Sequence, residues 1–263
     1  MNDRILGVIP ARLSSSRLRH KPLHPILGRP LLEWVWRRAV GMSCFDALVV
    51  ATDDEGIRDL CRSLGAPVML TDPAHPSGTD RVAEVARHPD WIGWDVVVNL
   101  QGDEPLLDAS HVEAAAELVT GGGWDVGTCA TPVRDLPSWR DPGVVKVART
   151  REGRALYFSR APIPFLRDGT PDEARLGGEP FLRHLGLYVY RREALFRWVG
   201  LPPSPLEEIE KLEQLRALEA GIGIGVAVVE AASPGVDTPE DAARMEILLD
   251  NVASTLTHPR SGR

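Results

Sequence analysis

Short apolar runs alternate with segments of helical periodicity through the first half of the chain. The apolar runs predict buried strands at residues 5–9, 47–52, 68–70 and 95–100. Apolar positions three and four residues apart predict helices at residues 30–40, 54–64, 79–87 and 108–120. Strands that alternate with helices are typical of an α/β fold, in which helices cover both faces of a mostly parallel, Rossmann-like sheet.

The pattern is less regular after residue 125. It predicts strands at residues 126–131, 144–150, 155–158 and 185–190. Residues 151–154 are typical of a hairpin turn, and residues 162–180 are rich in proline and glycine, which predicts a mobile loop. We interpret residues 130–190 as a smaller subdomain at one edge of the sheet, which could cover a substrate or pair with another subunit.

A long helix is predicted in the last quarter of the chain. Ser204 and Glu207 form a capping box, and Pro205 stands at the first helical position. Leucine and isoleucine residues then follow at helical spacing until Gly221. The pattern predicts one continuous helix between these signals.

The chain is expected to end in a tail. A strand is predicted at residues 224–229, and Thr238 begins a last helix. We expect a single domain over residues 1–250 and a C-terminal tail over residues 251–263, whose final residues are polar and contain proline and glycine.

Composition excludes several classes of protein. The net charge is −7, from 30 basic and 37 acidic residues, which argues against a nucleic-acid-binding protein. The three cysteines, Cys44, Cys61 and Cys129, are far apart and form no metal or redox motif, so we expect reduced, mostly buried thiols. No apolar run is long enough for a signal peptide or a membrane span. We therefore expect a cytoplasmic enzyme that does not bind membranes.

The first predicted strand opens into a cationic loop. This loop holds Arg12, Ser14, Ser15, Ser16, Arg17, Arg19, His20 and Lys21. Such a loop at the carboxyl end of a strand is typical of a phosphate site, and its cations suit a polyphosphate. A solvated basic loop is the alternative. There is no P-loop and no G-x-G-x-x-G, so side chains more than backbone amides would hold a nucleotide.

Two further loops carry carboxylates. Asp103 and Glu104 follow the strand predicted at residues 95–100, which suits a Mg²⁺ that also takes phosphate oxygens, although an acidic turn fits equally well. Asp237 lies after the last strand, and its alternative role is helix capping. Because Thr238 already fits the cap position, we expect Asp237 to complete a magnesium site with Asp103.

Other polar residues are candidates for contacts with a ligand. Ser77, Gly78, Thr79, Asp80 and Arg81 form a loop that could contact a base or ribose, or could simply cap a helix. Polar side chains also lie in otherwise apolar segments, at Arg160, Arg183, His184, Tyr188, Glu213 and Gln214. A lone histidine such as His184 is more often structural than catalytic.

Taken in order, these loops resemble the motifs of the sugar-activating cytidylyltransferases. V-I-P-A-R-L-S-S-S-R-L from Val8, with K-P-L from Lys21, is similar to the signature loop of that family. N-L-Q-G-D-E-P from Asn99 resembles the branch that acts on 3-deoxy-manno-octulosonate (Kdo). Further similar motifs begin at Ala51, Ser77, Ala155, Phe181, Ser204 and Gly235. The resemblance spans residues 5–249.

This resemblance implies a fold, a reaction and an assembly. The fold would be that of the nucleotide-diphospho-sugar transferases, and the protein would be a magnesium-dependent homodimer. The reaction would transfer CMP from CTP to the anomeric hydroxyl of Kdo, giving CMP-Kdo and pyrophosphate for lipopolysaccharide biosynthesis.

The resemblance also implies roles for individual residues. CTP contacts are implied at Arg12, Leu13, Ser14, Lys21, Ser77, Gly78, Thr79 and Arg81. Sugar contacts are implied at Gln101, Arg160, His184, Tyr188, Glu213 and Gln214. Asp103 and Asp237 would bind the metal, and Lys21, Arg12 and Asp103 would be catalytic.

The chain departs from the family pattern at one point. The family has proline and glycine before the lysine of the signature loop, whereas this chain has Arg19 and His20. Alternatives to the Kdo reaction are a cytidylyltransferase for a related acidic sugar, such as 8-amino-Kdo or a sialic acid, and a non-catalytic nucleotide-sugar sensor. A Rossmann dehydrogenase fits less well, because the glycine fingerprint is absent.

Overall fold

The computed structural model describes residues 3–13, 17–231 and 234–257. Within these residues a nine-stranded sheet has seven strands in the order β11-β7-β10-β6-β1-β4-β5, with β8 and β9 joined to one end of β10. The strands are β1 Ile5–Ala11, β4 Ala47–Thr52, β5 Val68–Leu70, β6 Val96–Asn99, β7 Val126–Pro132, β8 Lys146–Arg149, β9 Ala155–Ser159, β10 Leu182–Arg191 and β11 Ile224–Val228. A small hairpin pairs β2 Pro25–Ile26 with β3 Arg29–Pro30.

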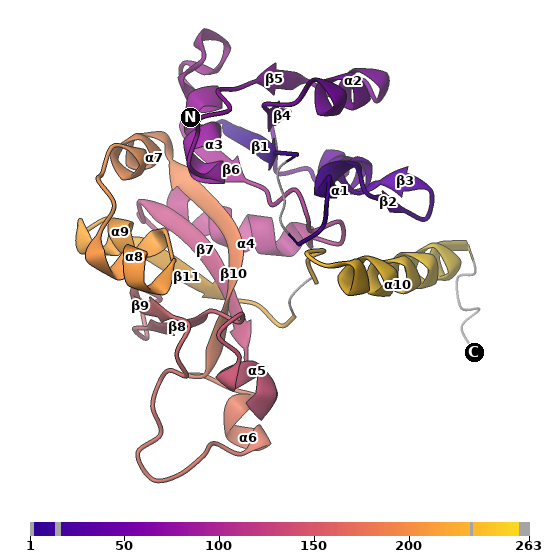
Figure 1. Cartoon of the computed structure of the whole chain (residues 1–263). Helices are drawn as coiled ribbons and strands as arrows, with labels where there is room; N and C mark the ends of the chain where they lie inside the picture. The colour runs from indigo at the N-terminus through magenta and orange to yellow at the C-terminus, as the bar shows by residue number, and fades with distance from the viewer. Residues whose placement is uncertain (1–2, 14–16, 232–233, 258–263) are drawn as a thin grey trace.

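Helices cover both faces of the sheet, as Figure 1 shows. One apolar core lies under α1 Leu31–Val40, α2 Glu55–Ser63, α4 Ala109–Thr120 and α10 Pro239–Thr257. The other lies under α3 Gly78–Arg87, α7 Arg192–Val199 and α9 Gln214–Glu219. Strands buried on both faces appear in the sequence as continuous apolar runs. In β6, for example, Val97 packs into one core and Val98 into the other. The predicted α/β class with a mostly parallel sheet is confirmed.

Several helix starts lie where the sequence predicts them. Asp54, Ser77 and Asp108 cap α2, α3 and α4 with side-chain oxygens that accept backbone N–H bonds. The described ranges contain no helix with both the length and the apolarity needed to cross a bilayer. Cys61 and Cys129 are buried and Cys44 is half-buried, and all three thiols are free.

Strand β10 is antiparallel and lies inside the sheet rather than at its edge. Its second half, Tyr188–Arg191, pairs with β6 and β7, while its first half pairs with β7 and β8. The register shifts between Leu185 and Tyr188. Strands β8 and β9, together with α5 Leu136–Arg140 and α6 Glu173–Leu176, extend from the main body in Figure 1 and are joined to the main sheet through β10. We call these four elements and the loops between them the extension.

Two predicted elements differ in extent. The helix expected from Ser204 to Gly221 is divided into α8 Pro205–Glu210 and α9, because Lys211 adopts a left-handed conformation with φ of 53°. A helix cannot continue through such a residue. Helix α10 extends to Thr257, past the position where we expected a tail, and residues 258–263 lie outside the described residues.

Candidate active site

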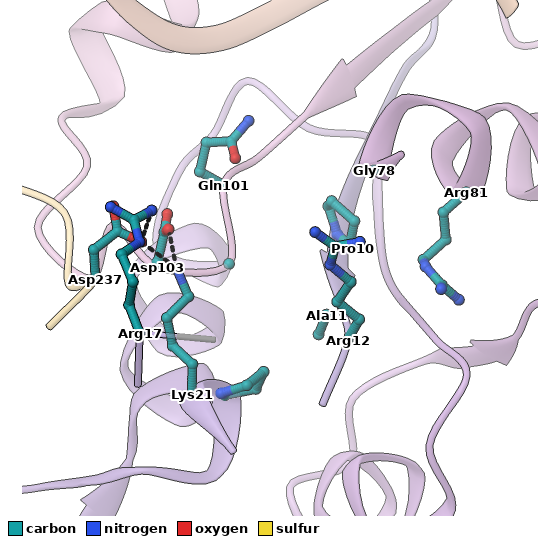
Figure 2. Close-up of a pocket in the computed structure, with 12 residues that line it drawn as sticks. Pro10, Ala11, Arg12, Arg17, Lys21, Gly78, Arg81, Gln101, Asp103 and Asp237 are labelled. Carbon is teal, nitrogen blue, oxygen red and sulfur yellow. Dashed lines mark hydrogen bonds and ion pairs between the residues drawn. The ribbon is translucent and has the colours of Figure 1, made fainter. Parts of the chain in front are cut away.

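A cavity of about 400 Å³ lies at the carboxyl ends of β1 and β6 (Figure 2). Its lining includes the charged residues Arg12, Arg17, Lys21, Arg81, Asp103 and Asp237. Gly102 lets the segment after β6 approach the end of β1, because a Cβ there would lie 2.8 Å from the Pro10 carbonyl oxygen. The cationic loop and one acidic loop predicted from the sequence therefore meet in space.

Lys21 lies between the two predicted metal ligands. Its Nζ is 2.5 Å from Asp103 Oδ2 and 2.9 Å from Asp237 Oδ1, and Arg17 Nη2 is 3.1 Å from the same Asp237 oxygen. Burial acts to lower the pKa of Lys21, but Asp103 and then Asp237 outweigh it, so its pKa is raised. Figure 2 shows these four side chains as one cluster on one side of the cavity. The ammonium therefore remains charged at neutral pH.

The two carboxylates suit a divalent cation. Their oxygens already converge on a single cationic group, the Lys21 ammonium. Among the described residues no cluster of three or more His, Cys, Asp or Glu side chains could hold a metal. A metal here would thus take two carboxylates and complete its shell with phosphate oxygens and water, which is the coordination that Mg²⁺ prefers.

The chain conformation before Lys21 bears on the departure from the family loop. His20 has φ of 52° and ψ of 40°, in the left-handed region, immediately before the short helix Lys21–Leu23. Glycine adopts this conformation without a steric penalty, whereas histidine does not. The loop thus keeps a glycine-type conformation although the glycine is absent.

Arg12 remains available to a ligand. It is exposed, and in the described ranges its guanidinium forms no hydrogen bond or ion pair. Leu13, an implied CTP contact, is half-buried and packs against one of the two apolar cores. Ser14 lies outside the described residues.

The helix α3 N-terminus forms the opposite wall of the first cavity. Gly78 and Arg81 line it, and the buried Arg81 guanidinium also contacts Asp53 Oδ2 at 3.0 Å and Thr71 Oγ1. Arg81 thus ties α3 to the ends of β4 and β5, which positions the wall.

Glu213, a predicted sugar contact, lies against this wall. Its carboxylate accepts hydrogen bonds from Ser77 Oγ at 3.0 Å and Thr79 Oγ1 at 3.2 Å. Burial raises the pKa of Glu213. The hydroxyls that we expected to contact CTP and the carboxylate that we expected to contact the sugar are therefore bonded to each other.

A second cavity, of about 450 Å³, lies where β10 passes from β8 to β6. We call it the sugar cavity. Of the predicted sugar contacts, it is lined by Gln101, His184, Tyr188 and Gln214. Gln101 Nε2 donates to the Gly186 carbonyl at 2.7 Å, which holds the end of β6 against the irregular part of β10. Gln101, Asp103 and Asp237 line both cavities, so the two join at the carboxylates.

His184 is a neutral hydrogen-bonding group in this cavity. Burial lowers its pKa to about 3. Thr128 Oγ1 donates its one proton to the Leu187 carbonyl at 2.6 Å, so His184 Nε2 donates to Thr128 Oγ1 at 2.9 Å. The other ring nitrogen, Nδ1, is consequently an acceptor.

Arg160, a predicted sugar contact, does not line the sugar cavity. Its guanidinium donates to the carbonyl oxygens of Glu210 at 2.7 Å, Pro142 at 2.9 Å and Lys211 at 3.3 Å. Because α8 ends at Glu210, the carbonyls of Glu210 and Lys211 need a donor outside the helix. Arg160 therefore joins the end of α8 to the segment before β8 that contains Pro142.

Three lining residues were named in the sequence analysis but given no role by the family resemblance. Arg17 binds Asp237, while Glu104 and Arg183 line the sugar cavity. Burial, with the Asp103 carboxylate beside it, raises the pKa of Glu104 to about 8. Arg183 stands out in sequence only as a charge beside apolar residues, which does not distinguish it from Arg160.

Comparison with known proteins decides the family. The sequence profile described as cytidylyltransferase matches residues 6–224. A 3-deoxy-manno-octulosonate cytidylyltransferase from Gemmatimonas aurantiaca is 48% identical over 241 residues, covering 91% of this chain and 92% of that protein. This chain belongs to the 3-deoxy-manno-octulosonate cytidylyltransferase family.

Other relatives agree with this family assignment. The 3-deoxy-manno-octulosonate cytidylyltransferase of Halorhodospira halophila is 50% identical over 239 residues, covering 89% of this chain and 92% of that protein. A solved structure of CMP:2-keto-3-deoxy-manno-octonic acid synthetase complexed with CTP superimposes with a TM-score of 0.86 and 36% identity, covering 95% of this chain and 99% of that one. The Kdo-branch resemblance is confirmed.

Proposed function

We propose that this protein transfers CMP from CTP to the anomeric hydroxyl of Kdo and releases pyrophosphate. The observation that carries this proposal is the junction of the two cavities at Asp103 and Asp237. One cavity is rich in cations and suits a triphosphate, and the other has the amide, hydroxyl and imidazole groups that suit a sugar. Their junction is where a sugar hydroxyl would meet the α-phosphate.

The protein's own groups would act mainly by positioning and by neutralising charge. Phosphoryl-type transfer needs little covalent work from the enzyme when the attacking and leaving oxygens are held in line. Arg12 and Lys21, on the cationic side, would offset the negative charge that grows on the leaving pyrophosphate. Arg17 would hold Asp237 in place through their ion pair.

We also propose that Asp103 and Asp237 hold Mg²⁺. The support is the convergence of their oxygens on one cationic position. When bound there, Mg²⁺ would polarise the α-phosphate and the attacking hydroxyl. Lys21, which lines the cavity beside both carboxylates, would then be free to contact the phosphates.

The test is pyrophosphate release with CTP and Mg²⁺, with Kdo, 8-amino-Kdo and a sialic acid supplied separately. We expect release with Kdo and none without Mg²⁺. Release only with another sugar acid would retain the reaction class and reassign the sugar. No release with any of them, from a protein that still binds CTP, would favour the nucleotide-sugar sensor.

We further propose that the protein is a homodimer that uses the extension. Leu156 on β9 is 59% exposed and Phe165, in the following loop, is 82% exposed, so both side chains would be free to pack against a second copy. Light scattering should give a mass near twice 28.8 kDa. The double variant Leu156→Ser, Phe165→Ser should shift that mass toward the monomer, and an unchanged dimer would reject this interface.

A further inference from the structure

Three cations, on or next to strands β8, β9 and β10, lie near the sugar cavity, and they differ in what they bind. Lys146 on β8 is fully buried, and its ammonium donates to the carbonyl oxygens of Asp141, Val144 and Arg160 at 2.8, 2.5 and 2.7 Å. Arg160 likewise donates to carbonyl oxygens. Both cations therefore form hydrogen bonds to backbone carbonyls and stabilise the backbone around them.

Arg183 is different. It lines the sugar cavity, and its guanidinium has no hydrogen bond or ion pair with any described part of the chain. Two carboxyls interact with its charge at longer range, those of Glu104 and Asp135. Asp135 is occupied, because it accepts the backbone N–H of Ser138 at 2.7 Å and the Ser138 hydroxyl at 2.9 Å. A half-buried guanidinium with five donors is thus available to an anion.

The strand register places a second cation opposite Arg183. Arg183 pairs directly with Lys146 in the antiparallel β8–β10 ladder. Like charges directly opposite each other are destabilising unless an anion compensates them. Lys146 donates to three carbonyl oxygens and also interacts with the carboxylates of Asp141 and Glu210, which compensate its charge. Arg183 is thus the cation of this pair whose guanidinium is left for a carboxylate.

We propose that Arg183 binds the carboxylate of the sugar acid and makes the cavity selective for acidic sugars. This inference rests on the proposed function and identifies the group by which the substrate class is recognised. The guanidinium fork matches a carboxylate in a bidentate geometry, which a lysine cannot reproduce. In a 2-keto sugar acid the carboxylate is attached to the anomeric carbon. Holding it would orient the anomeric hydroxyl toward the junction at Asp103.

The test compares Arg183→Gln with the unaltered protein, using Kdo and its C1 amide. A charge-assisted bidentate pair is worth about 10- to 100-fold, so KM for Kdo should rise by that factor while KM for CTP stays within twofold. The unaltered protein should prefer the acid over the amide by a similar factor, and Arg183→Gln should lose that preference. Arg183→Lys should recover only part of it.

Arg134→Gln is the matched control. Arg134 lies on the neighbouring cavity of about 270 Å³, and its guanidinium donates to the Glu230 carbonyl at 2.9 Å. This variant removes the same charge nearby and should leave the acid preference unchanged. If Arg183→Gln weakens the use of the acid and of the amide equally, its defect is structural, and that result would overturn the proposal.

Calorimetric binding of acid and amide, measured without CTP, separates this inference from the proposed function. If no pyrophosphate is released but the unaltered protein binds the acid more tightly than Arg183→Gln does, the function fails and the role of Arg183 stands. If pyrophosphate is released and Arg183→Gln keeps the acid preference, the function stands and the role of Arg183 fails. No detectable binding of the acid to the unaltered protein also overturns the role.

Discussion

The ammonium of Lys21 lies 2.5 Å from Asp103 Oδ2. The residue that we expect to bind phosphate and the residue that we expect to bind the metal are therefore paired with each other. Asp237 completes the arrangement at 2.9 Å from the same nitrogen. The pair of carboxylates is thereby compensated before any substrate binds. Binding of a metal and a triphosphate would exchange the partners of all three side chains.

Replacing Lys21 separates its two roles, as the partner of the carboxylates in the free protein and as a cation for the phosphates. In Lys21→Met the free protein should bind Mg²⁺ at least about tenfold more tightly, because the competing ammonium is gone, and this can be followed as Mg²⁺-induced thermal stabilisation. Pyrophosphate release should nevertheless fall about a hundredfold. Arg19→Met, which removes an exposed cation from the same loop, is the control. Weaker Mg²⁺ binding in Lys21→Met would contradict the shared cation position.

Asp103→Asn should lower turnover by about a hundredfold or more, on the scale of losing one electrostatic stabiliser. The remaining carboxylate of Asp237 should leave the protein folded, and circular dichroism should confirm this. The control Asp168→Asn changes a carboxylate that is 91% exposed, and its turnover should equal that of the unaltered protein. Near-normal turnover by a folded Asp103→Asn protein would remove Asp103 from the reaction.

His20→Gly should stabilise the protein. A left-handed non-glycine residue costs about 1–2 kcal/mol, and the greater entropy of glycine in the unfolded chain offsets part of the gain. We expect an increase in Tm of about 2 °C, measured by calorimetry. His20→Ala keeps the Cβ and should show no increase. A lower Tm for His20→Gly would show that the histidine side chain compensates the strain.

Arg160→Gln should affect stability more than sugar binding. It removes donors from three backbone carbonyls, which should cost about 1–3 kcal/mol in the free energy of unfolding. KM for Kdo and for CTP should each change less than threefold at 25 °C. Arg154→Gln, at an exposed turn position, should be neutral. A selective rise in KM for Kdo would restore Arg160 as a direct sugar contact.

His184 should make stability fall as the pH is lowered. Its folded pKa, about 3, is below the unfolded value of 6.5, so the unfolded state binds the proton first. Stability from this group is complete above pH 6.5 and is lost as the pH falls toward 3, by up to about 1.4 kcal/mol per pH unit. Urea unfolding at pH 7.5 and pH 5 should show a smaller loss for His184→Gln than for the unaltered protein. Equal losses would show that other groups govern the acid sensitivity.

The sequence by itself determined the strand and helix order, because apolar periodicity and helix caps are local signals. Ala47–Thr52 and Val68–Leu70 form strands with the predicted bounds, and Ser77 and Asp108 cap the predicted helices. It also placed Lys21, Asp103 and Asp237 as a group, since residues at the carboxyl ends of parallel strands meet at one edge of a sheet. The motifs that resemble the Kdo branch also identified the family from the sequence alone.

Only the tertiary structure decided which of several similar side chains faces the sugar cavity. Arg160 and Arg183 look alike in the sequence, yet one is bound to carbonyls freed by the break at Lys211 and the other is unpaired in the cavity wall. Likewise, Glu213 reaches Ser77 across 136 positions of sequence. These outcomes depend on contacts between distant segments, which periodicity and capping signals do not encode.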